Sequence, residues 1–321
     1  MKPLFLWPRP RPLEFRHLVG KPVSAEEIEI KLKDSFPDAW PVLFSSARAA
    51  LSAILNHLEL SRPDLVWCPP YSSHCVFETI ARTATPTTES ITPTAALIYH
   101  QWGHINHSTF PQETILIEDA VDTLFAPGDN PFAIGGRYAL WSLPKTIASL
   151  WGGVAFCRSE EDAVKIRHIR DRRPTPFTLQ AWLRLLGERF PSAHAYWHGV
   201  ESTGGRLPSF ALRHIFECLN ALPEIVDQRR HQLGLLQPYS LAQPPLRLPS
   251  CLPLPAEAHP DTSLISGQQL TAGLRSFNFA GVFPSPQWQK VFPAPIHQDT
   301  SGTDVAEFVA KINLQPPIQS R

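Results

Sequence analysis

The stretch VLFSSARAALSAILNHLEL, residues 42–60, sets a short apolar run directly before a segment with helical spacing. The run covers 42–44, and Ala50, Ile54 and Leu58 then recur at intervals of four residues. Apolar side chains at this interval indicate the buried face of an amphipathic helix. Two serines separate the patterns, which is typical of a helix N-terminus. The stretch therefore predicts a buried strand followed at once by a helix.

The same alternation continues along the chain for more than a hundred residues. Further apolar runs of strand length are followed or separated by segments that read as helices or turns; these runs are 65–71, 95–103, 115–125, 137–143 and 152–158. Several runs are apolar on both faces, as expected for strands that lie between two helix layers in a parallel sheet. The alternation predicts a doubly wound α/β domain.

The chain has 321 residues, which is more than one compact core usually occupies. After about residue 160 the pattern is mostly helical, and the last part mixes both types, with a terminal helix at 304–313. Proline crowds 238–260, which predicts an extended connection with one strand. We expect a large α/β domain over 1–225, including an N-terminal arm, and a small α+β domain over 226–321.

Composition excludes several classes of function. The 29 basic and 29 acidic side chains cancel, so a nucleic-acid or anionic-membrane partner is not expected. No stretch approaches the roughly 18 apolar residues that span a bilayer. The five cysteines form no Cys-x-x-Cys pair, so neither a disulfide framework nor a zinc cluster is indicated. A reduced cytoplasmic protein is expected.

One local basic cluster, at 165–173, interrupts this balance. Acidic residues directly before it favour a solvated helix face. The alternative is a surface that meets a phosphate-bearing ligand or a partner subunit.

Polar residues follow several of the predicted strands. Ligands bind at the carboxyl ends of parallel strands, so these residues are candidates for a site. Asp119 comes shortly after the apolar residues ILI at 115–117. Ser142 and then Lys145 follow RYALW at 137–141. Lys145 lies in WSLPKTIASLWGG and has no charged neighbour between Leu140 and Phe156. It is either a turn lysine that reaches solvent or an amine held in a pocket for its chemistry.

A lysine, an acid, a hydroxyl and a helix start at one sheet edge suit pyridoxal 5′-phosphate. Lys145 would form the Schiff base with the cofactor aldehyde and move protons at the substrate carbon. Asp119 would face the ring nitrogen and keep it protonated. The helix start after the first strand would bind the phosphate together with Ser142; its residues are Ser46, Ala47 and Arg48.

Each of these residues also has a simpler interpretation. Asp119 could cap a following helix, since aspartate is common at that position. Ser142 could only close a turn, and Ser46 could only cap its helix. His100 and His104 have the spacing of a metal pair, but a metal site is the weaker alternative, and no metal is expected.

The order of motifs resembles the DegT/DnrJ/StrS family of fold-type-I pyridoxal-phosphate enzymes, typified by sugar aminotransferases. Segments similar to the family's motifs occur in its order over roughly 40–313; they are FSSARAAL at 44–51, CPPYS at 68–72, IEDA at 117–120, SLPK at 142–145 with Gly152-Gly153, DQRR at 227–230 and FPAPIHQ at 292–298. The resemblance implies a mostly parallel sheet between helices and a small C-terminal domain.

The resemblance also implies an activity and an assembly. It implies transamination of a carbonyl on a sugar or another small metabolite, with glutamate as a plausible amino donor. It also implies a homodimer with the active site at the subunit interface.

The chain departs from the family pattern at four places. Ser142 precedes Lys145 by three residues where five is commoner, and Ala47-Arg48 replaces Gly-Thr. Asp122 stands where Gln or His usually lies near the cofactor's ring oxygen. Ser73 occupies the position of the aromatic that stacks on the ring, so His74 or Tyr71 would have to substitute. These departures keep open a degenerate, non-catalytic member, or an enzyme that uses the cofactor for another reaction.

Overall fold

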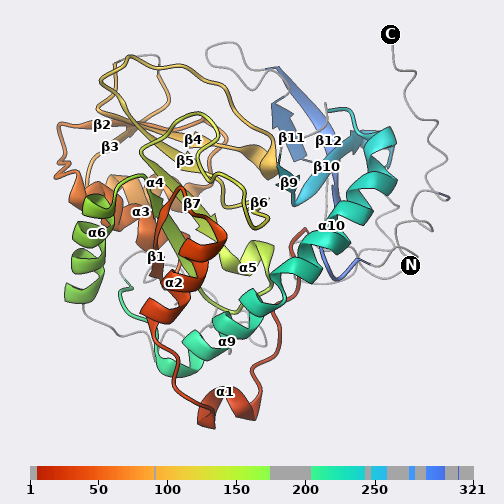
Figure 1. Ribbon diagram of the computed structural model, residues 1–321. Helices are drawn as coiled ribbons and strands as arrows, with labels where there is room; N and C mark the ends of the chain where they lie inside the picture. Colours follow the sequence, from red (N-terminus) through yellow and green to blue (C-terminus); the bar gives the residue numbers. More distant parts are fainter. Residues whose placement is uncertain are drawn as a thin grey trace, which may run out of the picture.

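The computed structural model describes residues 6–89, 92–173, 204–242, 247–258, 275–278, 287–300 and 310. The described residues form a seven-stranded sheet, a three-stranded sheet and a two-stranded sheet. Figure 1 shows helices packed around the large sheet, with the smaller sheets beside it. No helix in these ranges is long and apolar enough to cross a membrane.

The large sheet has the strand order β1-β8-β7-β5-β4-β2-β3. The strands are β1 (Trp40–Phe44), β2 (Leu65–Trp67), β3 (Thr85–Thr87), β4 (Ala95–Tyr99), β5 (Ile115–Asp119), β7 (Tyr138–Ser142) and β8 (Gly153–Cys157). Only β8 runs against its neighbours; the pairs β2–β3, β2–β4, β4–β5 and β5–β7 are parallel. The prediction of a mostly parallel sheet is confirmed.

The strand and helix predicted from residues 42–60 are both present. Strand β1 ends at Phe44, and α3 (Ala47–His57) begins three residues later. Ser46 Oγ accepts a hydrogen bond of 3.1 Å from Ala49 N and so caps the helix. The cap satisfies one of the amide groups that have no partner at a helix start.

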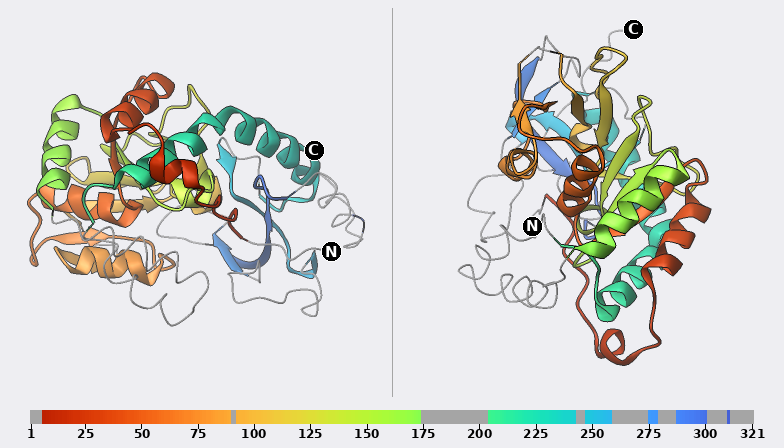
Figure 2. Two further views of the ribbon diagram at one scale, coloured as in Figure 1. Left: turned by 90° about the horizontal axis from the view of Figure 1, so that it is seen from below. Right: turned by 90° about the vertical axis from the view of Figure 1, so that its left-hand side faces the viewer.

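Helices cover both faces of the large sheet (Figure 2). One face packs against α2 (Ala25–Ser35) and α9 (Ser209–Asn220) in a core that contains Trp141 and Phe156. The other face packs against α3 and α6 (Glu160–Arg172), with α4 (His74–Ala81) at its edge. Burial of both faces explains why the strands are apolar throughout.

The basic cluster on α6 is partly internal. Arg170 is buried and pairs with Glu29 of α2 at 2.5 Å, and Arg167 pairs with the same carboxylate at 2.9 Å. The prediction of a solvated helix face is therefore wrong for Arg170, because its guanidinium is buried and joins α6 to α2.

The smaller sheets lie beside α10 (Leu222–Leu236), next to the large sheet in Figure 1. The three-stranded sheet is antiparallel and has the order β10-β12-β11; its strands are β10 (Cys251–Pro255), β11 (Arg275–Asn278) and β12 (Trp288–Pro295). The proline-rich region holds β10 and also β9 (Leu248–Pro249), where only one strand was predicted; β9 pairs with β6 (Thr123–Leu124). The expected domain boundary at 225/226 lies within α10, and nearly all of the helix predicted at 304–313 lies outside the described residues.

The N-terminal arm connects the two parts. Leu6 packs with Cys251, Phe277 and Val291 of the small sheet. Farther along, Arg11 N donates to Ala148 O at 2.8 Å, in the loop after Lys145. The arm thus passes over the carboxyl edge of the large sheet before α1 (Phe15–Val19).

Candidate active site

The sheet register places the predicted site residues at one edge. Gly153, the first residue of β8, lies opposite Phe44 on one side and Ser142 on the other. Asp119, the last residue of β5, lies between Tyr99 of β4 and Leu140 of β7. Phe44, Ser142 and Asp119 are the carboxyl ends of strands that run in one direction, and ligands bind at such ends.

Lys145 is held by two side chains from distant parts of the chain. It lies in α5 (Leu143–Thr146), which begins directly after β7. Its Nζ donates a 2.9 Å hydrogen bond to Asp122 Oδ1 and lies 4.7 Å from the ring centroid of Trp7. The Lys145 side chain is 36% exposed, whereas that of Asp122 is 1% exposed. The amine is thus paired with a buried carboxylate, while the lysine side chain keeps partial contact with solvent.

Asp122 divides its two oxygens between two donors. Oδ1 accepts from Lys145, and Oδ2 accepts from the hydroxyl of Tyr99. Burial lowers the pKa of Lys145, but the attraction of Asp122 outweighs burial, so this pKa stays above its ordinary value. Burial and the nearby Asp122 charge raise the pKa of Tyr99 well above its usual range, which keeps the phenol protonated.

The backbone of α5 is fixed by two residues from later in the chain. Arg229 of α10 is fully buried and donates from Nη2 to Thr146 O at 3.1 Å; Gln298 Nε2 donates to the same carbonyl at 3.4 Å. Burial lowers the pKa of Arg229 to about 10, so it remains charged at neutral pH. Two motifs of the sequence, at 227–230 and 292–298, thus meet at the residue after Lys145.

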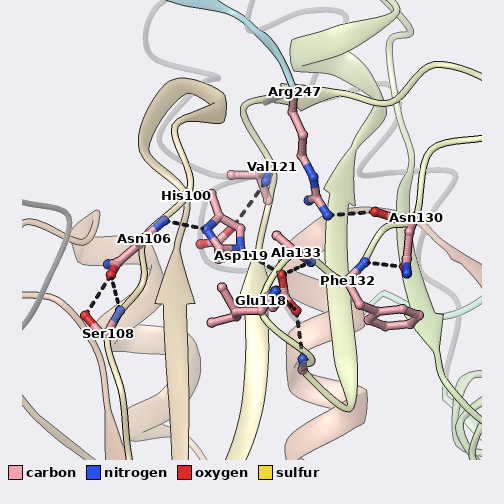
Figure 3. Close-up of polar contacts among 12 residues, drawn as sticks. His100, Asn106, Ser108, Glu118, Asp119, Val121, Asn130, Phe132, Ala133 and Arg247 are labelled. Carbon is pink, nitrogen blue, oxygen red and sulfur yellow. Dashed lines mark hydrogen bonds and ion pairs between the residues drawn. The ribbon is translucent and has the colours of Figure 1, made fainter. Parts of the chain in front are cut away.

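Asp119 has few hydrogen-bond donors. No helix follows it, because the chain turns into β6, so the helix-cap interpretation is wrong. Its Oδ1 accepts one long hydrogen bond of 3.3 Å from Val121 N (Figure 3). Burial raises its pKa to about 7, while Lys145 lowers it and Asp122 raises it further. The carboxylate is therefore suited to pair with a cationic N–H group brought by a ligand.

The neighbouring carboxylate, Glu118, serves a structural purpose. It points to the other face of β5, where Figure 3 shows it among backbone amides and His100. It accepts hydrogen bonds from Ala133 N at 2.7 Å, Gly136 N at 2.8 Å and His100 Nε2 at 2.9 Å. Burial raises the pKa of Glu118, but these donors outweigh burial and hold the pKa below its usual value.

The start of α3 has the form of an anion-binding site. A Cβ added at Gly153 would lie 2.1 Å from Ala47 N, so only glycine permits β8 to come this close to the helix start. Amides of the first helical turn have no partner within the helix and carry the positive end of its dipole. Ser45 Oγ is buried there without a hydrogen-bond partner in the described residues. A phosphate suits such a place.

The other predicted residues lie around this edge. Ser142 is mostly buried, and its side chain makes no cap bond at the start of α5. The Arg48 side chain extends toward Cys75 and Glu78 of α4, and burial lowers its pKa. His74 is exposed at the first residue of α4, next to Cys75. The roles predicted for these three residues remain predictions.

The metal alternative is not supported by the geometry. His100 donates to Glu118, whereas His104 packs against Phe277 with ring centroids 5.1 Å apart. Burial lowers the pKa of His104 to about 4. In the described ranges, no three His, Cys, Asp or Glu side chains cluster in a way that could hold a metal ion.

Three residues of this edge did not figure in the sequence-based site. Tyr99 directly follows the apolar residues AALI at 95–98 and is the last residue of β4. The rule that polar residues after strands are site candidates, which selected Asp119, would also have selected it. Ser45 directly precedes the predicted helix start. Trp7 carried no sequence signal, because only the path of the arm brings it to Lys145.

Solved structures with the same fold include several aminotransferases. "Putative sugar aminotransferase Spr1654" from Streptococcus pneumoniae has a TM-score of 0.65 at 13% identity, covering 97% of each chain. PseC from Helicobacter pylori has a TM-score of 0.61 at 12% identity, covering 97% of this chain and 98% of that one. A DegT DnrJ EryC1 StrS aminotransferase from Brucella abortus has a TM-score of 0.57 at 14% identity, covering 89% and 88%. These likenesses establish the fold.

The sequence itself gives the family. No curated protein matches the chain. A model of the family described as "Putative PLP-dependent aminotransferase" matches residues 28–313, which include every predicted site residue. The chain belongs to this family of pyridoxal-phosphate-dependent aminotransferases.

Proposed function

We propose that this enzyme transfers an amino group to a carbonyl of a sugar, or of another small metabolite, and that Lys145 is the residue that binds the cofactor covalently. One observation carries the proposal. Lys145 is held at the carboxyl edge of the sheet and is electrostatically coupled to Asp119, a buried acid with few donors. A structural acid in this place would have acquired protein donors, as Glu118 has.

Pyridoxal phosphate, when bound, supplies an aldehyde carbon that reacts with amines and a ring that withdraws electrons from a substrate carbanion. The chain's own residues supply the rest. Asp119 would hold the ring nitrogen in its protonated state, and Lys145 Nζ would move a proton at the substrate carbon. The amides of Ala47 and Arg48, with the hydroxyls of Ser46 and Ser142, would bind the phosphate.

The residues fit this group at both ends. At the phosphate end, Gly153 places no side chain against Ala47 N at the start of α3, and the buried hydroxyl of Ser45 lacks a partner within the described chain. At the ring end, Asp119 would gain a cationic partner that offsets the cost of its burial. Asp122 also fits, because it pairs with Lys145 and so need not oppose an anionic ring oxygen alone.

A sugar substrate is supported by the structures that share the fold. One is titled DesI in the presence of its TDP-sugar product, and PseC is described as an aminotransferase of pseudoaminic acid biosynthesis. We extend this substrate class to the present enzyme, with glutamate as amino donor. A cytoplasmic homodimer with the site at the subunit interface completes the proposal.

The first experiment records the near-visible absorption of purified protein with added pyridoxal phosphate, before and after borohydride. We expect a band that borohydride fixes covalently, with the label on the peptide that contains Lys145. The Lys145→Ala variant should lose the label, whereas Lys165→Ala, which removes an exposed lysine of α6, should keep it. A wild-type protein that shows no fixed label would refute the assignment.

The second experiment tests the substrate. Wild-type protein is incubated with glutamate and a panel of nucleotide-linked keto-sugars and simple keto acids, and 2-oxoglutarate release is measured. Turnover of the keto-sugars above that of keto acids supports the proposal. Turnover of keto acids alone would contradict the sugar substrate and leave the cofactor assignment intact.

A further inference from the structure

Asp122 is a buried carboxylate whose two oxygens have different partners. Oδ1 accepts from Lys145 Nζ at 2.9 Å, and Oδ2 accepts from the Tyr99 hydroxyl. The side chain is 1% exposed, so solvent screens this ion pair weakly. Tyr99 lies on β4 and Asp122 in the turn after β5, so the pair joins neighbouring parallel strands at the edge where Lys145 lies.

The other groups that face Lys145 do not replace Asp122. Asp119 and Cys75 act on the lysine through space, and Trp7 contributes its ring face. Among the described residues, Asp122 is the acid that forms an ion pair with Nζ. Around the pair, Tyr99 also faces Asp119 and Tyr71, and Asp122 lies near Cys251. None of these neighbours adds a second cation.

Resting on the proposed role of Lys145, we propose that Asp122, fixed by Tyr99, stabilises the ammonium form of Lys145 Nζ and thereby makes the neutral amine, when it is free, a stronger proton acceptor in transamination. When Nζ takes a proton from the substrate carbon, its lone pair forms the N–H bond and the C–H electron pair stays with the substrate. The new positive charge lies beside Asp122, which stays ionised throughout. Both residues act through Lys145 and are positioning residues.

Tyr99 is needed because a single buried hydrogen bond leaves a carboxylate incompletely satisfied. The phenol keeps its proton, so it donates a hydrogen bond to Asp122 Oδ2 and leaves Oδ1 to Lys145. The donated bond also restricts rotation of the carboxylate, which directs Oδ1 toward Nζ. Removing the hydroxyl should therefore weaken the ion pair without abolishing it.

The test follows the reactivity of Lys145 in cofactor-free protein against pH. Protein is acetylated with trace isotopic acetic anhydride, and peptide mass spectrometry gives the labelling midpoint of Lys145 relative to exposed Lys21. In Asp122→Asn the midpoint should fall by about one pH unit or more, since an opposite charge at this distance is lost. In Tyr99→Phe it should fall by a smaller amount. Circular dichroism verifies that each variant is folded.

Two matched controls separate this effect from general disturbance. Asp129→Asn removes a carboxylate that accepts from Ala126 N at 2.7 Å, and Tyr138→Phe removes a buried phenol at the opposite end of β7. Neither should move the midpoint of Lys145. A midpoint that stays unchanged in folded Asp122→Asn would overturn the inference, as would controls that shift it as far as Asp122→Asn does.

The outcome is independent of the proposed function. Acetylation needs no cofactor, whereas the borohydride experiment does. A shifted midpoint with no borohydride label at Lys145 would mean that the ion pair exists but the lysine is not the cofactor residue. A borohydride label without a shifted midpoint would keep the proposed function and remove the positioning role of Asp122.

Discussion

Glu118 and Asp119 are consecutive acids of one strand, and they lie in opposite environments. Glu118 accepts hydrogen bonds from His100 and from amides of the 133–136 segment, whereas Asp119 accepts one long bond from its own turn. Both are buried. The pKa of Glu118 is held below its usual value, while that of Asp119 is raised to about 7. Hydrogen-bond donors lower the pKa of Glu118, whereas Asp119 has one long hydrogen bond and the Asp122 charge raises its pKa further.

The comparison distinguishes an acid that the fold satisfies from an acid that we propose to bind the cofactor. The fold satisfies Glu118 completely, and this carboxylate ties His100 and the 133–136 segment to the sheet. Within the described residues, Asp119 has one long hydrogen bond, at the edge where a ligand would lie. An acid that costs stability in the free protein and recovers it on binding is what a cofactor site requires.

The largest expected effect is on activity. Asp119→Asn should lower kcat/KM about 10²–10³-fold, the loss typical of removing one preorganised electrostatic partner. Glu118→Gln, in contrast, should lower kcat/KM far less in the protein that remains folded. Steady-state kinetics on both variants make the comparison. Equal losses in the two would remove the distinction between a functional and a structural acid.

The two acids should also make stability depend on pH with opposite signs. The folded-state pKa of Asp119 is raised, so its contribution is present below about pH 4 and is lost as the pH rises through about 7, at a cost of up to about 4 kcal/mol. The folded-state pKa of Glu118 is lowered, so its contribution is present at neutral pH and is lost on acidification. Urea unfolding of cofactor-free protein between pH 4 and 8 measures the Asp119 trend, and its extension down to about pH 2 measures the Glu118 trend.

Asp119→Asn sharpens this test because it removes one trend alone. The variant should be more stable than wild type near pH 8, and the difference should shrink toward pH 4. A variant that is less stable than wild type at pH 8 would show that Asp119 has protein donors which the comparison leaves out.

Glu118→Gln should destabilise the protein at neutral pH by about 2 kcal/mol, because hydrogen bonds to a buried charge are lost. In addition, the new side-chain NH₂ group would face the backbone N–H groups that now donate to Glu118. Thermal unfolding measures the change. Glu161→Gln removes an exposed acid of the i,i+4 pair with Lys165 and should leave stability nearly unchanged, because solvent screens this pair. If the two variants lost the same stability, the network around Glu118 would not be the cause.

The smallest effect concerns the aromatic side of the site. Trp7→Ala removes the ring face that lies 4.7 Å from Lys145 Nζ and should weaken the ammonium form by about 0.5–1 kcal/mol. The labelling midpoint of Lys145 should fall by less than in Asp122→Asn. Trp40→Ala removes the equivalent contact with Lys33, 3.8 Å away on α2, and should leave Lys145 unchanged. A rise of the midpoint in Trp7→Ala would contradict the contact.

Much of the fold could be predicted because its signals are local. Apolar runs and four-residue spacing placed β1, α3 and the strands of the large sheet, since side-chain period reports which faces are buried. The rule for carboxyl ends then selected Asp119, Ser142 and Lys145 from positions directly after strands. Asp119 as a helix cap was the wrong alternative, because nothing local distinguishes a turn into β6 from a helix start.

The sequence by itself determined the strands of the mostly parallel sheet, and it predicted the edge, the acid and the amine that we propose for the site. Only the tertiary structure decided how those groups are charged. Asp122 reaches Lys145 across 23 residues, Tyr99 joins it from another strand, and Trp7 arrives with the N-terminal arm. Charge depends on burial and on donors within a few ångströms, and chain neighbours supply few of either.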